Sequence, residues 1–109
     1  MKIVDLATFL AYPDGVVFAE YDPCIIGEIE VRGDVWMYDK LSNCCYQRFS
    51  LFGADNPPCG LGTEGELETD VYSRTGPGLN EKQLFAVFDK KDISVMINRL
   101  QRALDEAKE

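Results

Sequence analysis

The chain contains no histidine, so it lacks the commonest general base and proton shuttle of enzymes. Cys44 or Cys45 could act as a nucleophile only with the help of a nearby cation, such as Lys40 or Arg48. Paired carboxylates are numerous, but 109 residues rarely build both such a pair and a substrate cleft. We therefore expect a protein that is not an enzyme and has no catalytic residues.

The lack of histidine and of any CxxC spacing also disfavours an ordinary zinc site. No signal peptide precedes the cysteines, so disulfides are not favoured either. The cysteines are Cys24, Cys44, Cys45 and Cys59. We expect free, partly buried thiols and no bound metal.

A nucleotide cofactor is disfavoured although Gly60, Gly62 and Gly65 spell GxGxxG. The dinucleotide motif must leave a buried strand and open a helix. Here two prolines precede the glycines and an acidic run follows, in which Glu64 would repel a pyrophosphate. We expect no cofactor.

Long apolar runs are absent, and the N-terminus lacks a basic segment followed by an apolar stretch. We expect neither membrane insertion nor secretion, which indicates a cytoplasmic protein. The length suits a single domain over residues 1–109, and 46% hydrophobic residues can fill one core.

Basic residues are too few to balance the acids, and the net charge is −8. Residues 1–40 hold three basic residues against eight acidic ones, and residues 61–80 hold one against four. The segments 41–60 and 81–109 are balanced. Acidity that served solubility alone would be spread evenly, so this distribution favours an interaction surface.

Residues 64–70 place an acid at every second position. In an extended strand these carboxylates would share one face at about 6.7 Å spacing, roughly twice the charge spacing of one DNA strand. Such a ladder could imitate a phosphate backbone. The alternatives are an exposed acidic loop, favoured by repulsion between the carboxylates, and calcium binding, for which the usual loop pattern is missing.

The candidate partner-binding residues are acids of these two segments. They are Glu20, Asp22, Glu28, Glu30, Asp34, Glu64, Glu66, Glu68 and Asp70. We expect them to bind a protein with a basic, nucleic-acid-binding surface, and we expect a monomer or a weak dimer. Direct binding of nucleic acid is disfavoured because few basic residues accompany the aromatic ones. The aromatic residues Trp36, Tyr38, Tyr46 and Phe49 are instead expected in the core of a sheet.

Alternating and β-branched residues predict strands. The expected strands cover residues 16–21, 25–32, 35–38, 46–52 and 84–88. Within the second of these, Ile29 and Val31 alternate with charged residues, which predicts aliphatic side chains in the core and charged ones in water. Gly33 and Asp34 are then expected to turn the chain.

Two helices are expected, a short one capped by Asp5 and a long one capped by Asp89. The long helix carries an apolar stripe of Ile93, Met96, Ile97, Leu100, Leu104 and Ala107. We expect this stripe to pack on the sheet, although a helix that docks in a partner's groove would look the same. The predicted fold class is α+β, with an antiparallel sheet of four to five strands covered by the C-terminal amphipathic helix and a short N-terminal helix.

The opening stretch resembles small proteins of tailed phages and prophages. The matching residues are Phe9, Leu10, Ala11, Pro13, Gly15, Phe18, Tyr21, Pro23, Cys24, Gly27 and Gly33. The likeness covers about the first 35 residues, with a vaguer one where residues 84–89 lead into the last helix. It implies a phage or prophage origin and a place of action in the bacterial host cell.

Three functions remain open for a small acidic phage protein. It could inhibit host defence, as anti-CRISPR proteins do, by occupying a basic nucleic-acid channel. It could be an immunity protein that neutralises a nuclease toxin. It could also be a phage structural or assembly component that uses a self-association edge.

If the acidic ladder mediates binding, Glu66→Lys combined with Glu68→Lys should abolish partner binding and leave thermal unfolding nearly unchanged. Pull-down and a melting curve of the same variant measure both effects. Binding that survives the reversal would make the ladder a solvated loop.

Overall fold

The computed structural model describes residues 1–51, 54–55, 66–67, 73–76 and 78–107. Its elements are β1 (Lys2–Val4), α1 (Leu6–Ala11), β2 (Val17–Asp22), β3 (Ile25–Ile26), β4 (Glu30–Trp36), a 3-10 turn (Leu41–Asn43), β5 (Cys45–Ser50), β6 (Ala54–Asp55), β7 (Glu66–Leu67), β8 (Ser73–Arg74), β9 (Leu84–Phe88) and α2 (Lys90–Glu106).

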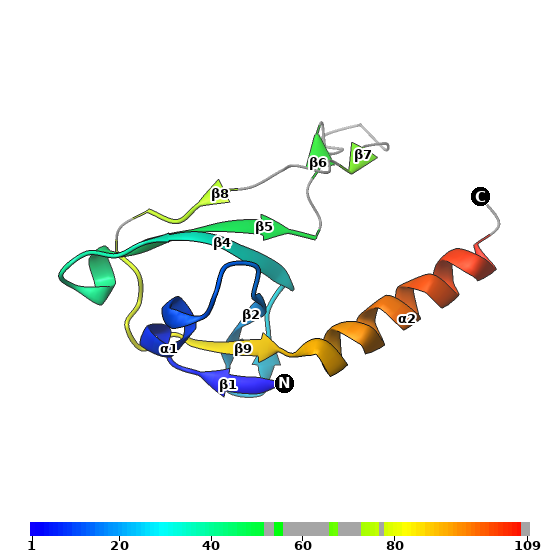
Figure 1. Ribbon diagram of the computed structural model, residues 1–109, viewed down its shortest axis with the longest axis horizontal. Coiled ribbons are helices and arrows are strands. Elements are labelled where there is room, and N and C mark those ends of the chain that lie inside the picture. The colour runs from blue at the N-terminus through cyan, green and yellow to red at the C-terminus, as the bar shows by residue number, and fades with distance from the viewer. Residues whose placement is uncertain (52–53, 56–65, 68–72, 77, 108–109) are drawn as a thin grey trace.

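The strands form an antiparallel sheet in the order β1-β9-β2-β4-β5-β8, and β3 also pairs with β2 (Figure 1). Strands β6 and β7 form a separate pair. The predicted α+β class with two helices is confirmed. The main sheet has more strands than expected because β1, β3 and β8 are too short to give a periodic signal in the sequence.

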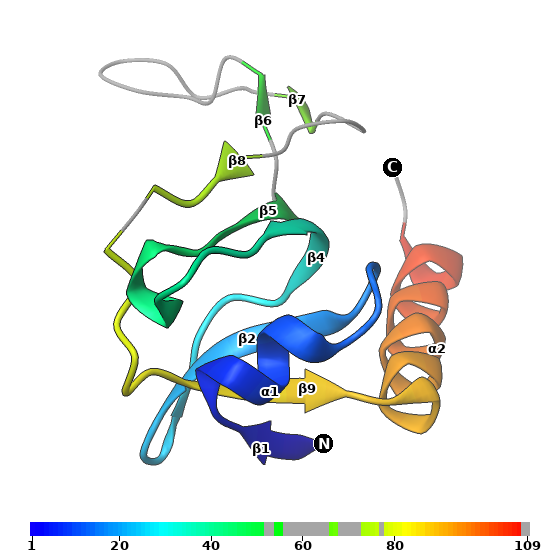
Figure 2. The ribbon, with the colours of Figure 1, turned by 60° about the vertical axis from the view of Figure 1, so that its left-hand side comes forward.

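The core lies between α1 and the sheet (Figure 2). Phe9, which is fully buried, is at its centre. Its ring stacks on Phe85, with centroids 4.0 Å apart, and contacts Phe18 and Tyr46 at 4.7 and 5.2 Å. Such ring pairs stabilise a fold beyond the area they bury. Asp5 caps α1 as predicted, since its carboxylate accepts a hydrogen bond from the amide of Thr8.

The predicted strand over residues 25–32 is interrupted, and its two faces are exchanged. Tyr21 pairs with Ile26, but Phe18 pairs with Glu30, so three steps along β2 match four steps along the facing chain. This bulge shifts the register by one residue, which moves every later side chain to the opposite face. Glu30 and Arg32 are therefore buried, and the prediction that they face water is wrong.

A turn at Gly33 and Asp34 is also wrong, because β4 runs through both residues. The sheet register shifts between Arg32 and Val35, which marks a second bulge. A Cβ atom on Gly33 would lie 2.5 Å from the side-chain oxygen of Gln47 on β5. A larger residue at position 33 would therefore displace the Gln47 side chain. The predicted strand over residues 35–38 is in part the continuation of β4.

Arg32 is fully buried and joins β4 to the C-terminal end of α1. Its guanidinium donates hydrogen bonds of 2.6 Å to the carbonyl oxygens of both Phe9 and Tyr12, and it lies 3.4 Å from a carboxylate oxygen of Asp14. The last carbonyls of a helix have no partner within it, so this cation satisfies and stabilises the end of α1. Burial lowers the pKa of Arg32, and Asp14 opposes that shift.

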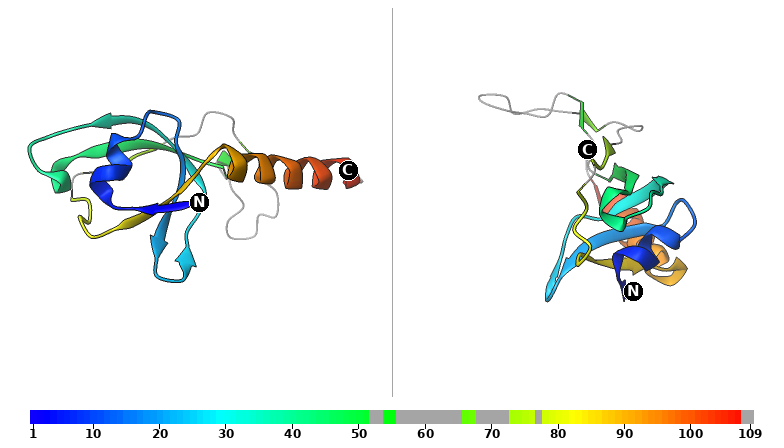
Figure 3. Two further views of the ribbon diagram at one scale, coloured as in Figure 1. Left: turned by 60° about the horizontal axis from the view of Figure 1, so that its bottom comes forward. Right: turned by 90° about the vertical axis from the view of Figure 1, so that its left-hand side faces the viewer.

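Helix α2 begins where predicted, but it does not cover the sheet. Asp89 and Asp92 form a reciprocal capping box at its start. The helix then projects away from the sheet beyond β9, and none of its described residues is buried (Figure 3). The expected packing of the apolar stripe on the sheet is therefore wrong. Among the described residues, neither helix is long and apolar enough to span a membrane.

The predictions for aromatic residues and thiols have mixed outcomes. Tyr46 is in the core, and burial raises its pKa to about 12, whereas Tyr38 is 56% exposed and its predicted core position is wrong. Trp36 and Phe49 are partly buried. Free thiols are confirmed for the described cysteines, which are Cys24, Cys44 and Cys45, and Cys59 lies outside the described residues.

Replacing Arg32 with methionine should lower the free energy of unfolding by about 3 kcal/mol, because the carbonyl oxygens of Phe9 and Tyr12 lose their charge-assisted hydrogen bonds. Urea denaturation measures the effect. Arg48→Met is the matched control, since Arg48 pairs with Arg32 in register but is partly exposed, and it should cost much less. Equal losses in the two variants would contradict the role given to Arg32.

Candidate functional site

Three of the predicted acidic residues surround one hollow on the sheet. Glu20 on β2, Glu28 in the loop before β4 and Glu30 on β4 line a cavity of about 300 Å³ together with Arg48. The first bulge creates this grouping, because it turns Glu30 toward the side on which Glu20 lies. A hydrogen bond from the hydroxyl of Ser50 holds the carboxylate of Glu28.

The hollow is acidic but contains one cation. Arg48 lies 3.6 Å from the carboxylate of Glu30 and also donates to the hydroxyl of Ser73 at 3.3 Å. Burial raises the pKa of Glu30, and the charges of Glu28 and Glu20 add to the rise, while Arg48 opposes it. An added positive charge at this hollow would therefore stabilise the ionised form of Glu30.

The other candidate acids do not line this hollow. Asp22 is exposed at the end of β2, where it pairs with Ile25. Asp34 is exposed at the second bulge, and its backbone amide donates to the side chain of Gln47 at 3.4 Å. Glu66 begins the two-residue strand β7, while Glu64, Glu68 and Asp70 lie outside the described residues. The ladder over residues 64–70 therefore stays a prediction.

Exposed aliphatic residues accompany the acids at the β2–β3 hairpin. Ile25 and Ile26 are 65% and 48% exposed, directly after Cys24, which has a positive φ of 69° at the turn. L-residues other than glycine rarely adopt this conformation, so the turn is strained. The hairpin presents two large apolar side chains beside Asp22, a combination that is common at protein interfaces.

Lys40 and Arg48 were considered as cations that could activate a cysteine nucleophile. The cationic side chain that contacts a thiol in the described residues is instead that of Arg74. Arg74 of β8 donates to the sulfur of Cys45 at 3.1 and 3.3 Å, and its guanidinium lies 4.1 Å from the ring centroid of Trp36. Cys45 is only 4% exposed. The cluster ties β8 to β5 and does not present the thiol to solvent.

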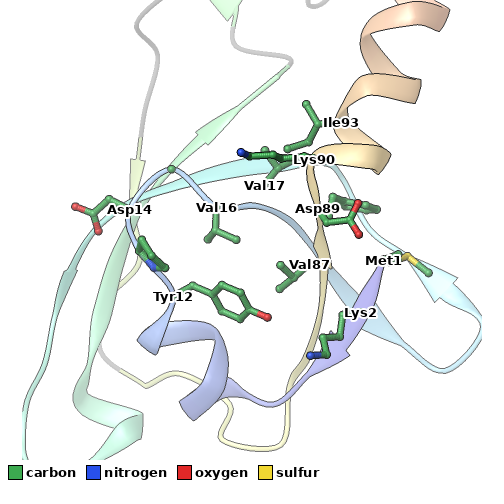
Figure 4. A pocket seen from close by; sticks show the side chains of 13 residues that line it. Met1, Lys2, Tyr12, Asp14, Val16, Val17, Val87, Asp89, Lys90 and Ile93 are labelled. Carbon is green, nitrogen blue, oxygen red and sulfur yellow. The ribbon is translucent and has the colours of Figure 1, made fainter.

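A groove at the base of α2 escaped the sequence analysis. It measures about 830 Å³ and is lined by the side chains of Tyr12, Val16, Val87 and Ile93, together with two bases, Lys2 and Lys90, and two acids, Asp14 and Asp89 (Figure 4). These residues come from α1, β1, β2, β9 and α2 or their connections, so only the three-dimensional fold brings them together. No local sequence signal could have found the groove.

Metal binding receives no geometric support in the described part of the chain, where no three His, Cys, Asp or Glu side chains are placed to hold an ion. No family model, no curated protein and no solved structure matches the chain. Two surfaces of the described chain are candidates for binding: the acidic hollow with its hairpin, and the apolar face of α2 with its groove.

Replacing Glu30 with glutamine should stabilise the protein at neutral pH and have a smaller effect in acid. Because the pKa of Glu30 is raised in the fold, the native state holds more protons than the unfolded chain above the ordinary value of 4.5. The ionised carboxylate therefore lowers the free energy of unfolding as the pH rises from 4.5 through the raised pKa of the folded state. Glutamine carries no charge and removes this effect.

Urea denaturation of both proteins at pH 7 and pH 4 measures the difference. Glu81→Gln, on an exposed turn, controls for the loss of one negative charge. A Glu30→Gln variant that is less stable than the wild type at pH 7 would show that the ion pair with Arg48 outweighs burial.

Proposed function

We propose that the protein is a non-enzymatic, phage-encoded inhibitor that binds a basic, nucleic-acid-binding protein of a bacterial defence system, in the manner of anti-CRISPR proteins. The observation that carries the proposal is the grouping of Glu20, Glu28 and Glu30 around one hollow, with Asp22 on the same strand as Glu20. A basic partner would find several carboxylates within a short distance of one another.

The backbone supports this use of the acids. Glu20 and Glu30 lie on paired strands of the sheet, so their positions are set before the partner arrives. Preorganised charge costs little ordering entropy on binding, and complementary fields raise the rate of encounter. Arg48 already compensates Glu30 in part, so the exposed Glu20 and Glu28 are the residues with most to contribute.

The hairpin would supply the apolar part of the contact. Charged residues at the rim of an interface mainly steer and select, while buried apolar anchors supply most of the affinity. Ile25 pairs with Asp22, shares the face of Asp22 and Glu20, and is 65% exposed, so it is suited to that role. An acidic surface with adjoining aliphatic anchors favours a protein partner over a small cation.

A second candidate, a phage assembly component, is favoured by a different observation. The apolar stripe of α2 is exposed, with Leu100 at 67% and Leu104 at 68%. An assembly protein would use such a face to associate with other subunits. In that case the acidic hollow would not be needed for binding.

The inhibitor proposal predicts that Glu20→Lys combined with Glu28→Lys reduces capture of the partner from bacterial lysate by about tenfold or more at low salt. Duplex DNA added as a competitor should release the wild-type partner, because both would occupy one basic surface. Quantitative mass spectrometry of the eluates at low and high salt measures capture.

Glu81→Lys combined with Asp39→Lys is the matched control, since it changes the charge equally at exposed positions outside the hollow. Its capture should remain near the wild-type level. The proposal would be refuted if the Glu20 and Glu28 reversals left capture of the partner unchanged. It would also be refuted if DNA did not compete with the protein for that partner.

A further inference from the structure

We infer that Cys45 and Trp36 hold Arg74 on the face of the sheet opposite to the acidic hollow, and that they thereby fix the register in which β8 joins the sheet. Arg74 is then a positioning residue for the hollow, because its placement on the far face brings the neighbouring Ser73 to the hollow. The inference rests on the proposed function in that the hollow is taken as the binding site.

The register of β8 decides which of its side chains reaches the hollow. Strand β8 consists of two residues and pairs with β5, with Ser73 opposite Arg48 and Arg74 opposite Gln47 (Figure 1). Opposite residues of an antiparallel pair project to the same face, and neighbours along a strand project to opposite faces. Ser73 therefore shares the face of Arg48, while Arg74 shares the face of Gln47. So short a strand specifies its register weakly, and a slip of one residue would exchange the two faces.

A cleft on the far face holds the guanidinium of Arg74. Cys45 lies two residues before Gln47 on β5 and pairs with Trp36 of β4, so these three side chains share that face. Arg74 donates to the sulfur of Cys45 through Nε and Nη2 at 3.3 and 3.1 Å, and its guanidinium carbon lies 4.1 Å from the ring centroid of Trp36. The indole attracts the cation, and the planar fork of donors is a property of arginine that lysine lacks.

On the other face, Ser73 completes the acidic hollow. Its hydroxyl accepts a hydrogen bond of 3.3 Å from Nε of Arg48, the same nitrogen that lies 3.6 Å from the carboxylate of Glu30. Ser73 lines the hollow, whereas Arg74 lines a separate cavity together with Cys45. The register thus places a neutral hydroxyl, and not a second guanidinium, among the carboxylates.

The hollow would itself attract Arg74. Its described lining holds three carboxylates and one guanidinium, so a second cation there would gain from the excess of negative charge. A slip that set Arg74 opposite Arg48 would reduce the excess that a basic partner needs. The sulfur and the indole on the far face compete with this attraction and hold the guanidinium away. The acidity of the hollow therefore depends on a contact that lies outside it.

NMR titration of the Glu30 side-chain carboxyl carbon in the full chain tests the inference, because a cation that enters the hollow lowers the pKa of that group. Arg74→Lys keeps the charge but loses the fork of donors, and Cys45→Ala removes the sulfur. Each should lower the pKa of Glu30 toward its ordinary value of 4.5. The charged groups around Glu30, which are Glu20, Glu28 and Arg48, are the same in every variant.

Arg74→Met separates positioning from packing, because it removes the charge together with the contact. Adding Cys45→Ala to Arg74→Met should not lower the pKa of Glu30 further, since no cation remains on β8 to enter the hollow. Cys44→Ala is the matched control. The buried sulfur of Cys44 contacts backbone atoms of Tyr38 and Lys40, so its loss should leave the Glu30 titration unchanged.

The inference would be overturned if Arg74→Lys and Cys45→Ala left the pKa of Glu30 unchanged, or if Cys45→Ala lowered it equally with and without Arg74. An unchanged near-ultraviolet circular dichroism spectrum confirms that each variant keeps its core. Arg74→Lys alters an exposed side chain and decides the test by itself if Cys45→Ala does not fold. The titration needs no partner, so its failure would leave the capture experiment to decide the proposed function.

Discussion

The guanidinium of Arg32 holds the short helix α1 on the sheet, and the core depends on that attachment. A helix of six residues cannot be stable alone, and its terminal carbonyls need donors that it does not contain. Arg32 reaches them from a strand that is 20 or more residues away in sequence and thereby fixes Phe9 among the aromatic rings. The buried charge is tolerated because the guanidinium has carbonyl and carboxylate partners.

The bulge between β3 and β4 is what turns Arg32 inward. Without the extra residue, Ile29 would face Phe18, and the charged side chains of β4 would point to the other face of the sheet. The same shift brings Glu30 beside Glu20 and raises its pKa. A single inserted residue thus produces both the internal anchor and the acidic hollow.

The sequence predicted those features that depend on local patterns. The capping residues Asp5 and Asp89, strand β9 and the long helix were all correctly expected, because each has a local signal. The exchange of faces in β4 was not predicted, because the alternation of Ile29 and Val31 with charged residues looks the same in either register. The position of α2 also could not be predicted, because an apolar stripe is equally suited to a sheet and to another helix.

Helix α2 stands apart from the core, and residue-resolved amide hydrogen exchange of the dilute protein measures this separation. We expect the amides of β2 and β9 to exchange only on global unfolding, while those from the middle of α2 exchange at a much lower opening free energy. Amides of α2 as protected as those of β9 in the dilute protein would instead show that the helix packs on the sheet.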